Sequence, residues 1–264
     1  MQSHNKPYFL LFGAAKSGTT SLFNYLTQHS DIYIPEVKEC RFFSQLPKNY
    51  KGLGAEFFPN SGITDERVYF NLFSGHEDKV CGDMSNDYLY YYEKSIKNIK
   101  KYLGNEIKIV IVLRNPIDRT YSNYQIGVKY GSENLSFEEA IREEKKFLEN
   151  NTSQVDPELK YSRPRSYLAK SHYSEQIKMW HKKFPRNQLL IISTEEYTTQ
   201  HQKTFDDIFR FLELPTHKIG NPEKKKVEKY VSMNSNTRQQ LLDYFRPYNS
   251  DLYKLIGKEF DWNI

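Results

Sequence analysis

The segment that decides the fold lies near the start of the chain and reads Phe9-Leu10-Leu11-Phe12-Gly13-Ala14-Ala15-Lys16-Ser17-Gly18-Thr19-Thr20-Ser21-Leu22. Its apolar first half has the length and composition of a buried parallel strand. The glycines free the backbone to wrap around an anion, and the helix that follows directs its unpaired N–H groups at that anion. The segment therefore predicts a strand, a loop that binds phosphate or sulfate, and a helix.

The loop differs from the common nucleoside-triphosphate loop, which reads G-x-x-x-x-G-K-[ST] and places a lysine directly after the second glycine. Gly13 and Gly18 have the right spacing, but Thr19 follows Gly18 and the lysine of the loop is Lys16. We expect Lys16 to reach the outermost group of a ligand that resembles a 5'-diphosphate. The alternative is a Gly/Ser turn without a ligand. Hydroxyl groups for the inner phosphate would come from Ser17, Thr19, Thr20 and Ser21.

Residues 16–22, Lys-Ser-Gly-Thr-Thr-Ser-Leu, resemble the 5'-phosphosulfate-binding loop of the sulfotransferases that use 3'-phosphoadenosine 5'-phosphosulfate (PAPS). The resemblance implies that residues 16–21, Gly18 included, bind this cofactor and its product 3'-phosphoadenosine 5'-phosphate (PAP). It also implies a second element, a strand that ends in Arg and is followed two helical turns later by a Ser. These two residues hold the 3'-phosphate of the nucleotide in the family.

Residues 107–124 match this second element, since an apolar, β-branched run ends at Arg114 and Ser122 follows. Pro116 suits the first turn of a new helix. The resemblance therefore implies that Arg114 and Ser122 bind the 3'-phosphate. Without the resemblance, Arg114 is equally well a cation at the end of a strand that forms a salt bridge.

A candidate base lies in the segment Lys38-Glu39-Cys40-Arg41-Phe42-Phe43, which resembles the Lys-Glu-x-x-Phe-Phe signature of the heparan-sulfate-type, carbohydrate-modifying branch of the family. The resemblance implies that Glu39 is the catalytic base and that Lys38 contacts cofactor or substrate, with Arg41 beside them. A carboxylate between Lys38 and Arg41 should stay ionised. The alternative is a surface ion pair beside two core phenylalanines, and Glu36 is a second carboxylate nearby.

These residues predict an in-line mechanism. Glu39 would take the proton from an acceptor hydroxyl or amine that attacks sulfur, while Lys16 and helix N-terminal amides would stabilise the charge on the leaving oxygen. A sulfuryl group carries less negative charge than a terminal phosphoryl group, so we expect no metal ion.

Two segments depart from the family pattern. The loop Lys-Gly-Arg, which clamps the cofactor phosphates in the branch, is Lys226-Val227-Glu228 here, so Lys226 or Lys229 would supply the charge and Tyr230 would lie near the adenine. The branch segment Glu-Lys-Ser-Pro-x-Tyr is Asp83-Met84-Ser85-Asn86-Asp87-Tyr88. Its lysine lines the acceptor side of the branch's cleft, and we expect Asp87 on that side with Lys38 and Arg41.

Strand-like and helix-like segments alternate, which predicts an α/β fold with a central, mainly parallel sheet of the P-loop-containing nucleotide-binding type, as one domain over residues 1–264. Further resemblance to the branch, at 170–185 and 233–262, extends the likeness over nearly the whole chain. The expected strands are 8–13, 79–82, 107–113 and 188–193, and the expected helices are 18–29, 94–103, 116–130, 136–149, 170–184, 200–213, 235–245 and 249–257.

Composition fits an enzyme with an anionic cofactor. The net charge of +5 is modest for 264 residues and does not indicate a nucleic-acid partner. The two cysteines, Cys40 and Cys81, are expected to be free thiols. The chain shows neither a signal peptide nor a membrane span, so we expect a cytoplasmic protein, or a protein of the Golgi lumen if an anchor precedes it.

Alternatives remain at this stage. The leading prediction is a PAPS-dependent sulfotransferase for a carbohydrate hydroxyl or amine. A sulfotransferase for a small alcohol, phenol, lipid or protein tyrosine has the same cofactor motifs. A P-loop kinase or NTPase would require a lysine after Gly18, and a polyanion-binding module would have no chemistry. The sequence does not predict the acceptor or the oligomeric state.

Overall fold

A computed structural model of the chain describes residues 6–37, 39–45, 62–150, 166–220 and 231–262. The described residues divide into two compact units, the first comprising 6–37, 39–45, 62–114 and 178–220, the second 115–150, 166–177 and 231–262. The expectation of one domain stays a prediction. The elements are β1 (Phe9–Gly13), α1 (Thr19–Leu26), β2 (Ile32–Tyr33), α2 (Glu66–Asn71), β3 (Val80–Met84), α3 (Tyr92–Leu103), β4 (Lys108–Leu113), α4 (Pro116–Lys129), α5 (Phe137–Asn150), η2 (Ala169–Ser171), α7 (Tyr173–His181), η3 (Arg186–Gln188), β5 (Leu189–Ser193), α8 (Thr194–Thr199), α9 (His201–Phe211) and α10 (Ser235–Ile256).

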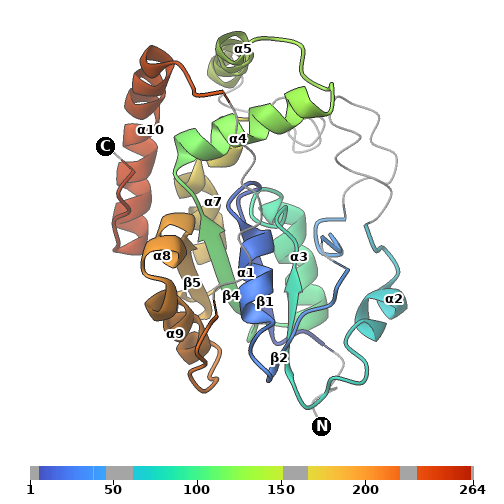
Figure 1. The fold of residues 1–264 in the computed structure, drawn as a ribbon. Helices are drawn as coiled ribbons and strands as arrows, with labels where there is room; N and C mark the ends of the chain where they lie inside the picture. The colour runs from blue at the N-terminus through green and yellow to red at the C-terminus, as the bar shows by residue number, and fades with distance from the viewer. Residues whose placement is uncertain (1–5, 38, 46–61, 151–165, 221–230, 263–264) are drawn as a thin grey trace. The chain divides into compact units, whose positions relative to one another are not determined.

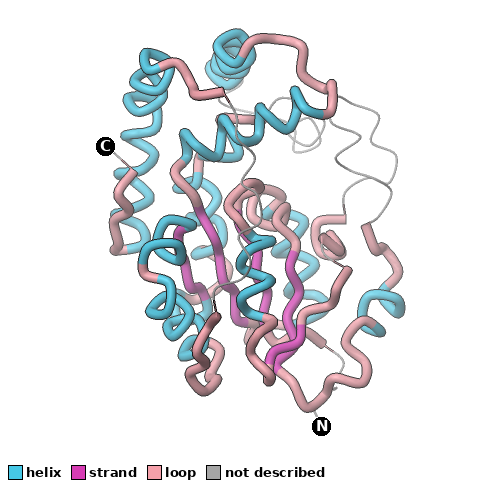
Figure 2. The backbone as a smooth tube through the Cα atoms, viewed as in Figure 1, coloured by secondary structure: helices cyan, strands magenta, loops and turns pink. Residues whose placement is uncertain are grey.

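A parallel sheet forms the centre of the first unit, with strand order β2-β3-β1-β4-β5 (Figure 2). Every residue of β1 is buried, as are all residues of β4 after Lys108. Strands covered on both faces read as continuous apolar runs, which is why these two were visible in the sequence. The predicted α/β class with a parallel sheet is confirmed.

Helices cover both faces of this sheet (Figure 1). On one face, α1, α8 and α9 pack against Phe9 and Leu11 of β1 and Val110 and Val112 of β4. On the other face Phe12 meets Trp180 of α7, with ring centroids 4.6 Å apart. Alternate residues of β1 therefore enter two different cores, and this fixes the register of the strand from which the predicted anion loop leaves.

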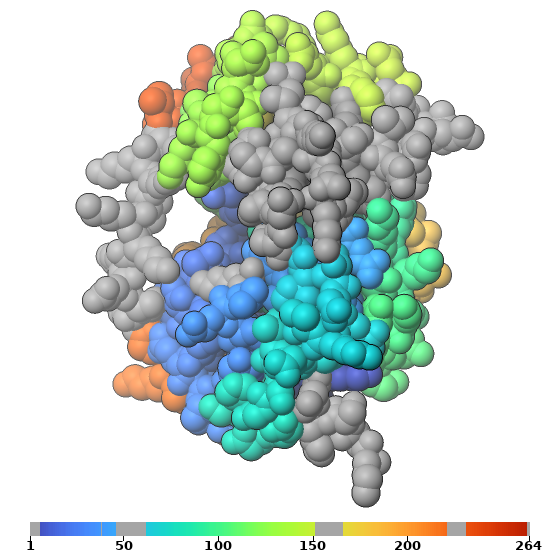
Figure 3. All heavy atoms as spheres, turned by 90° about the vertical axis from the view of Figure 1, so that its right-hand side faces the viewer, coloured from blue at the N-terminus to red at the C-terminus, as the bar shows by residue number. Residues whose placement is uncertain are grey.

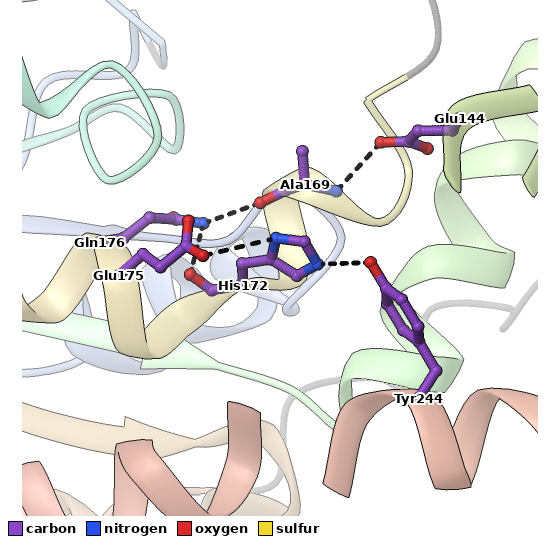
Figure 4. Close-up of polar contacts among 6 residues, drawn as sticks. All are labelled: Glu144, Ala169, His172, Glu175, Gln176 and Tyr244. Carbon is purple, nitrogen blue, oxygen red and sulfur yellow. Dashed lines mark hydrogen bonds and ion pairs between the residues drawn. The ribbon is translucent and has the colours of Figure 1, made fainter. Parts of the chain in front are cut away.

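The second unit is helical and has its own core, in which α4, α5 and α10 contribute apolar side chains. Polar contacts join its segments, as Figure 4 shows. The buried carboxylate of Glu144 accepts hydrogen bonds from the backbone N–H groups of Leu168 (2.9 Å) and Ala169 (3.0 Å), of which Figure 4 draws the second. Nε2 of His172 lies 2.9 Å from the hydroxyl of Tyr244 on α10. These bonds attach the segment around η2 to α5 and α10.

The described structure adds four short elements to those that we expected, namely β2, α2, η3 and α8. Each has at most six residues, too short for a periodic pattern. The helix α2 lies on the surface (Figure 3), where only Tyr69 is fully buried. None of the helices in the described part of the chain combines the length and the apolar character that a membrane span requires.

The two expected helices at 235–245 and 249–257 are one helix, α10, which contains Pro247, so the expected break between them is wrong. Proline removes one intrahelical hydrogen bond and usually kinks or ends a helix. Here the buried stripe continues through Phe245, Asn249 and Leu252, on both sides of the proline. Packing of this stripe offsets the lost bond.

Gly13, the last residue of β1, lies too close to the backbone of β4 to carry a side chain. A Cβ at this position would lie 2.0 Å from the carbonyl oxygen of Val112 in β4, closer than van der Waals contact permits. We expect Gly13→Ala to separate two central strands and to lower the melting temperature strongly, or to abolish soluble expression. Gly220→Ala is the matched control, because its Cβ would meet an ordinary contact at 3.5 Å. Equal melting temperatures for the two variants would contradict this account.

Candidate active site

The loop between β1 and α1 is held by side chains of the first unit. The carbonyl groups of three successive loop residues each accept a hydrogen bond from a side chain that follows β4 or β5. The bonds are Arg114 Nη1 to Lys16 O (3.0 Å), Thr194 Oγ1 to Ser17 O (2.8 Å) and Tyr197 Oη to Gly18 O (3.2 Å). The loop is therefore fixed by its carbonyl groups, and it is not an unsupported surface turn.

Gly18 is required where the loop enters α1. It has φ = 74°, and a Cβ would lie 2.0 Å from the hydroxyl oxygen of Tyr197. As the N-cap of α1 it offers no side chain to the first helical N–H groups, and the first turn contains no acidic residue. The first N–H groups of a helix point out of its N-terminal end and carry a partial positive charge, so this helix end favours an anion.

The loop residues fit the phosphosulfate end of PAPS. The hydroxyl of Ser17 is completely buried and has no hydrogen-bond partner among the described residues, which is costly unless a ligand supplies one. Lys16 is half-buried and adopts φ = 75°, a strained conformation for a residue with a side chain. Thr19 is buried, Thr20 exposed and Ser21 half-buried in the first turn of α1. A buried hydroxyl, a lysine and an uncapped helix end together suit a sulfated phosphate.

The structure places one of the two predicted 3'-phosphate ligands directly after β4 and the other in the middle of α4. Arg114 directly follows β4, as predicted, and is half-buried, and Pro116 occupies the first turn of α4. The guanidinium of Arg114 also supports the loop by donating a hydrogen bond to the carbonyl oxygen of Lys16, a role that the sequence did not indicate. Ser122 is buried on α4 in the second unit. Its partnership with Arg114 stays a prediction.

Glu39 lies in a tight segment, residues 39–44, that we call the base turn. Its backbone N–H donates to the carbonyl oxygen of Met84 at the end of β3 (3.1 Å). Its carboxylate accepts the backbone N–H of Asn86 (Oε2 to N, 2.9 Å). Because β3 runs parallel to β1 as its neighbour, the exit of β3 and the anion loop lie at the same edge of the sheet. The structure therefore holds Glu39 at the sheet edge that carries Lys16.

Two more carboxylates lie behind Glu39. Asp83 is fully buried and accepts the hydroxyls of Tyr69 (2.9 Å) and Tyr88 (2.8 Å). Asp87, which we predicted to face an acceptor, is also buried, and its Oδ2 accepts the hydroxyl of Ser44 at 2.6 Å. The described contact of Asp87 is thus with the base turn, and a role toward an acceptor stays a prediction.

The expectation that Glu39 stays ionised is wrong. Burial, followed by the nearby charge of Asp87, raises the pKa of Glu39 from 4.5 to about 8. The Asn86 N–H and the charge of Arg41 lower this pKa but do not compensate. Burial likewise raises the pKa of Asp83 to about 6. A raised pKa of this kind is typical of carboxyl groups that accept protons at neutral to basic pH.

Four predicted site residues, Lys38, Lys226, Lys229 and Tyr230, lie outside the described residues. Conversely, sequence reasoning missed Thr194 and Tyr197, which support the loop from α8. One signal was available, because Ser193 and Glu196 form a capping box of the S-x-x-E type. It marks the start of α8 directly after β5.

The sulfotransferase domain family matches residues 6–244. A crystal structure of a sulfotransferase from Alicyclobacillus acidocaldarius is 33% identical to this chain with a TM-score of 0.80, covering 98% of this chain and 99% of that one. The membrane-associated sulfotransferase kil1 of Dictyostelium discoideum is 24% identical over 97% of this chain, which spans 66% of kil1. Bifunctional heparan sulfate N-deacetylase/N-sulfotransferase 1 of Xenopus laevis is 26% identical over 96% of this chain, which spans 30% of that protein.

The chain belongs to the sulfotransferase domain family. Its α/β fold with an all-parallel sheet is the sulfotransferase fold of the P-loop type. The resemblance that the loop and strand motifs indicated is confirmed, and with it the use of PAPS that defines this family.

The raised pKa of Glu39 makes stability depend on pH. Between the ordinary pKa of 4.5 and the folded value of about 8, the folded chain keeps a proton that the unfolded chain releases. Stability conferred by this proton is present below 4.5 and is lost as the pH rises through about 8. Glu39→Gln has no carboxyl proton to lose. The melting temperature of Glu39→Gln minus that of wild type should therefore increase as the pH rises from 4.5 to about 8. The exposed Glu36→Gln is the control, and a difference for Glu39→Gln that does not vary with pH would contradict the raised pKa.

Proposed function

We propose that this chain transfers the sulfuryl group of PAPS to a hydroxyl or amine of a carbohydrate, with Glu39 as the base. One observation carries the proposal: the half-buried Glu39, whose carboxyl group has a raised pKa, is held at the exit of β3, beside the strand whose loop carries Lys16. Ligands of open α/β sheets bind at this edge of the strands.

The proposed residues divide the chemistry between them. When bound, PAPS supplies a sulfuryl group attached to a phosphate oxygen that can leave as PAP. Glu39 takes the proton of the acceptor O–H or N–H as the acceptor forms its bond to sulfur. Lys16 and the first N–H groups of α1 stabilise the negative charge that develops on the departing phosphate oxygen as the old S–O bond breaks. Arg114 keeps the loop in place through the Lys16 carbonyl group.

Two observations support a carbohydrate acceptor. Residues 38–43 resemble the signature of the carbohydrate-modifying branch. The N-deacetylase/N-sulfotransferases that this chain resembles act, by their names, on heparan sulfate, and human and mouse members are 26–28% identical to this chain. An amine of a glucosamine-containing glycan is therefore our first choice, with a sugar hydroxyl second.

Turnover of Glu39→Gln and Lys16→Ala tests the proposed roles. We expect Glu39→Gln to lower turnover about 10²–10⁴-fold, because it removes a general base. Lys16→Ala should lower turnover about 10²–10³-fold, because it removes a donor from the leaving oxygen. Wild-type turnover should rise as the pH rises through about 8, where Glu39 ionises.

Formation of PAP from PAPS is the readout, and binding of PAP by calorimetry is the control. Glu39→Gln should bind PAP as wild type does, and PAP should bind without magnesium. The exposed Lys203→Ala is the matched lysine control. Full turnover by Glu39→Gln would exclude it as the base, and a preference for ATP with magnesium would favour a kinase.

A panel of acceptors tests the acceptor class. N-desulfated heparin offers amines, heparosan offers only hydroxyls, and 4-nitrophenol and a tyrosine peptide represent the other classes. We expect transfer of ³⁵S from labelled PAPS to N-desulfated heparin to exceed transfer to the phenol or the peptide by more than about tenfold, the specificity that binding energy of about 1.4 kcal/mol confers. Preference for 4-nitrophenol or the peptide would refute the carbohydrate assignment.

A further inference from the structure

The dipeptide Ser85-Asn86, directly after β3, contacts both strained residues of the base turn. The hydroxyl oxygen of Ser85 accepts the backbone N–H of Arg41 at 3.1 Å. The backbone N–H of Asn86 donates to the carboxylate of Glu39 at 2.9 Å. Ser85 is completely buried, and Asn86 is half-buried. One dipeptide of β3 therefore binds the base and the residue two positions after it.

The base turn needs such support because its backbone is strained. Glu39 has φ = 59° and Arg41 has φ = 54°, in the left-handed region that residues with a Cβ rarely adopt. A residue of this kind is strained and persists only where the surroundings hold it. The two hydrogen bonds from the dipeptide act on these same two residues. The two residues with a strained backbone are therefore the two residues that the dipeptide contacts.

Asn86 is also a departure from the family segment. The resembling segment reads Glu-Lys-Ser-Pro-x-Tyr, and its proline falls at position 86. Proline has no backbone N–H and cannot make the bond that Asn86 makes to Glu39. The donor to the base carboxylate is therefore a feature of this chain that the family pattern does not contain.

We propose that Ser85 and Asn86 are positioning residues for sulfuryl transfer, with the Asn86 N–H aiming the Glu39 carboxylate and the Ser85 hydroxyl fixing the turn that carries it. The inference rests on the proposed role of Glu39 as base. It goes beyond that role by assigning the base a specific backbone donor.

The charges around Glu39 determine how loss of this donor acts. Asp83 and Asp87, at the end of β3 and beyond it, disfavour the ionised form of Glu39, whereas Arg41 favours it. Cys40, on the same turn, is buried and has a raised pKa, so its thiol stays neutral. The backbone N–H of Asn86 also favours the ionised form of Glu39. Without this N–H, less remains to offset the effect of Asp87 and Asp83, and we expect the pKa of Glu39 to rise further above about 8.

Asn86→Pro and Asn86→Ala form a matched pair, since both remove the side-chain carboxamide and proline alone removes the backbone donor. We expect Asn86→Pro to lower turnover of N-desulfated heparin at neutral pH by about tenfold, which corresponds to a rise of about one unit in the pKa of the base. The acid limb of its pH profile should move to higher pH. Asn86→Ala should match wild type in both respects, and PAP affinity should stay constant throughout.

Ser85→Ala and Ser95→Ala form a second pair. Ser95 is also completely buried, and its hydroxyl has no hydrogen-bond partner among the described residues, so its loss measures only the removal of a buried oxygen. We expect Ser85→Ala to lower turnover about 10- to 100-fold, as misplacement of a catalytic group does, while PAP affinity is retained. Equal turnover in the two variants would overturn the role of Ser85, and so would a parallel loss of turnover, PAP affinity and melting temperature.

A readout without an acceptor separates this inference from the proposed function. The melting-temperature difference between each Asn86 variant and its Glu39→Gln double variant reports the pKa of Glu39 directly. The pH window of this difference should extend to higher pH in Asn86→Pro and stay unchanged in Asn86→Ala. Identical windows would overturn the inference even if Glu39 is the base. An extended window together with full turnover by Glu39→Gln would sustain the contact and refute the base.

Discussion

The close backbone approach of β1 to β4 at Gly13 is the constraint on which the candidate site depends. Glycine alone leaves room for the carbonyl oxygen of Val112, and the N–H of Ala14 then donates to that same oxygen at 3.0 Å. The loop thus begins at a fixed point, and the three carbonyl groups that follow are tied to side chains at the ends of β4 and β5. An anion site built in this way is organised before a ligand arrives, so little binding energy is spent on ordering the loop.

The protonation of Glu39, the proposed base, depends on opposing effects of burial and of neighbouring groups. Burial that makes Glu39 a stronger base also keeps it protonated up to a pH of about 8. Each carboxyl group placed near it, Asp83 and Asp87, increases that effect, and the backbone donor from Asn86 reduces it. The tyrosine hydroxyls on Asp83 keep a buried charge satisfied where water cannot reach it. Reactivity at this position therefore reflects several buried polar contacts around one carboxyl group.

Sequence patterns predicted the parts of this molecule that are local. The strand and glycine loop of 9–22 and the strand that ends before Arg114 are contiguous, so their roles could be inferred from neighbouring residues. The protonation of Glu39 could not, because it depends on burial by the folded chain and then on Asp87 and Asp83, more than forty positions away in sequence. The continuity of α10 through Pro247 depends likewise on tertiary packing of its buried stripe, which overrides the local preference of proline.

Recognition of the cofactor and recognition of the acceptor also differ in how far local sequence predicts them. The predicted cofactor contacts come from short motifs at the ends of adjacent strands. The predicted acceptor side depends on single positions at which this chain departs from the family segment, and Met84 illustrates the consequence. The branch has a lysine at this position, whereas the Met84 side chain packs into the core with Leu11 and Val110. This position contributes apolar packing in place of a positive charge. If the acceptor is the anionic glycan that we propose, this position at the exit of β3 therefore offers it no cation.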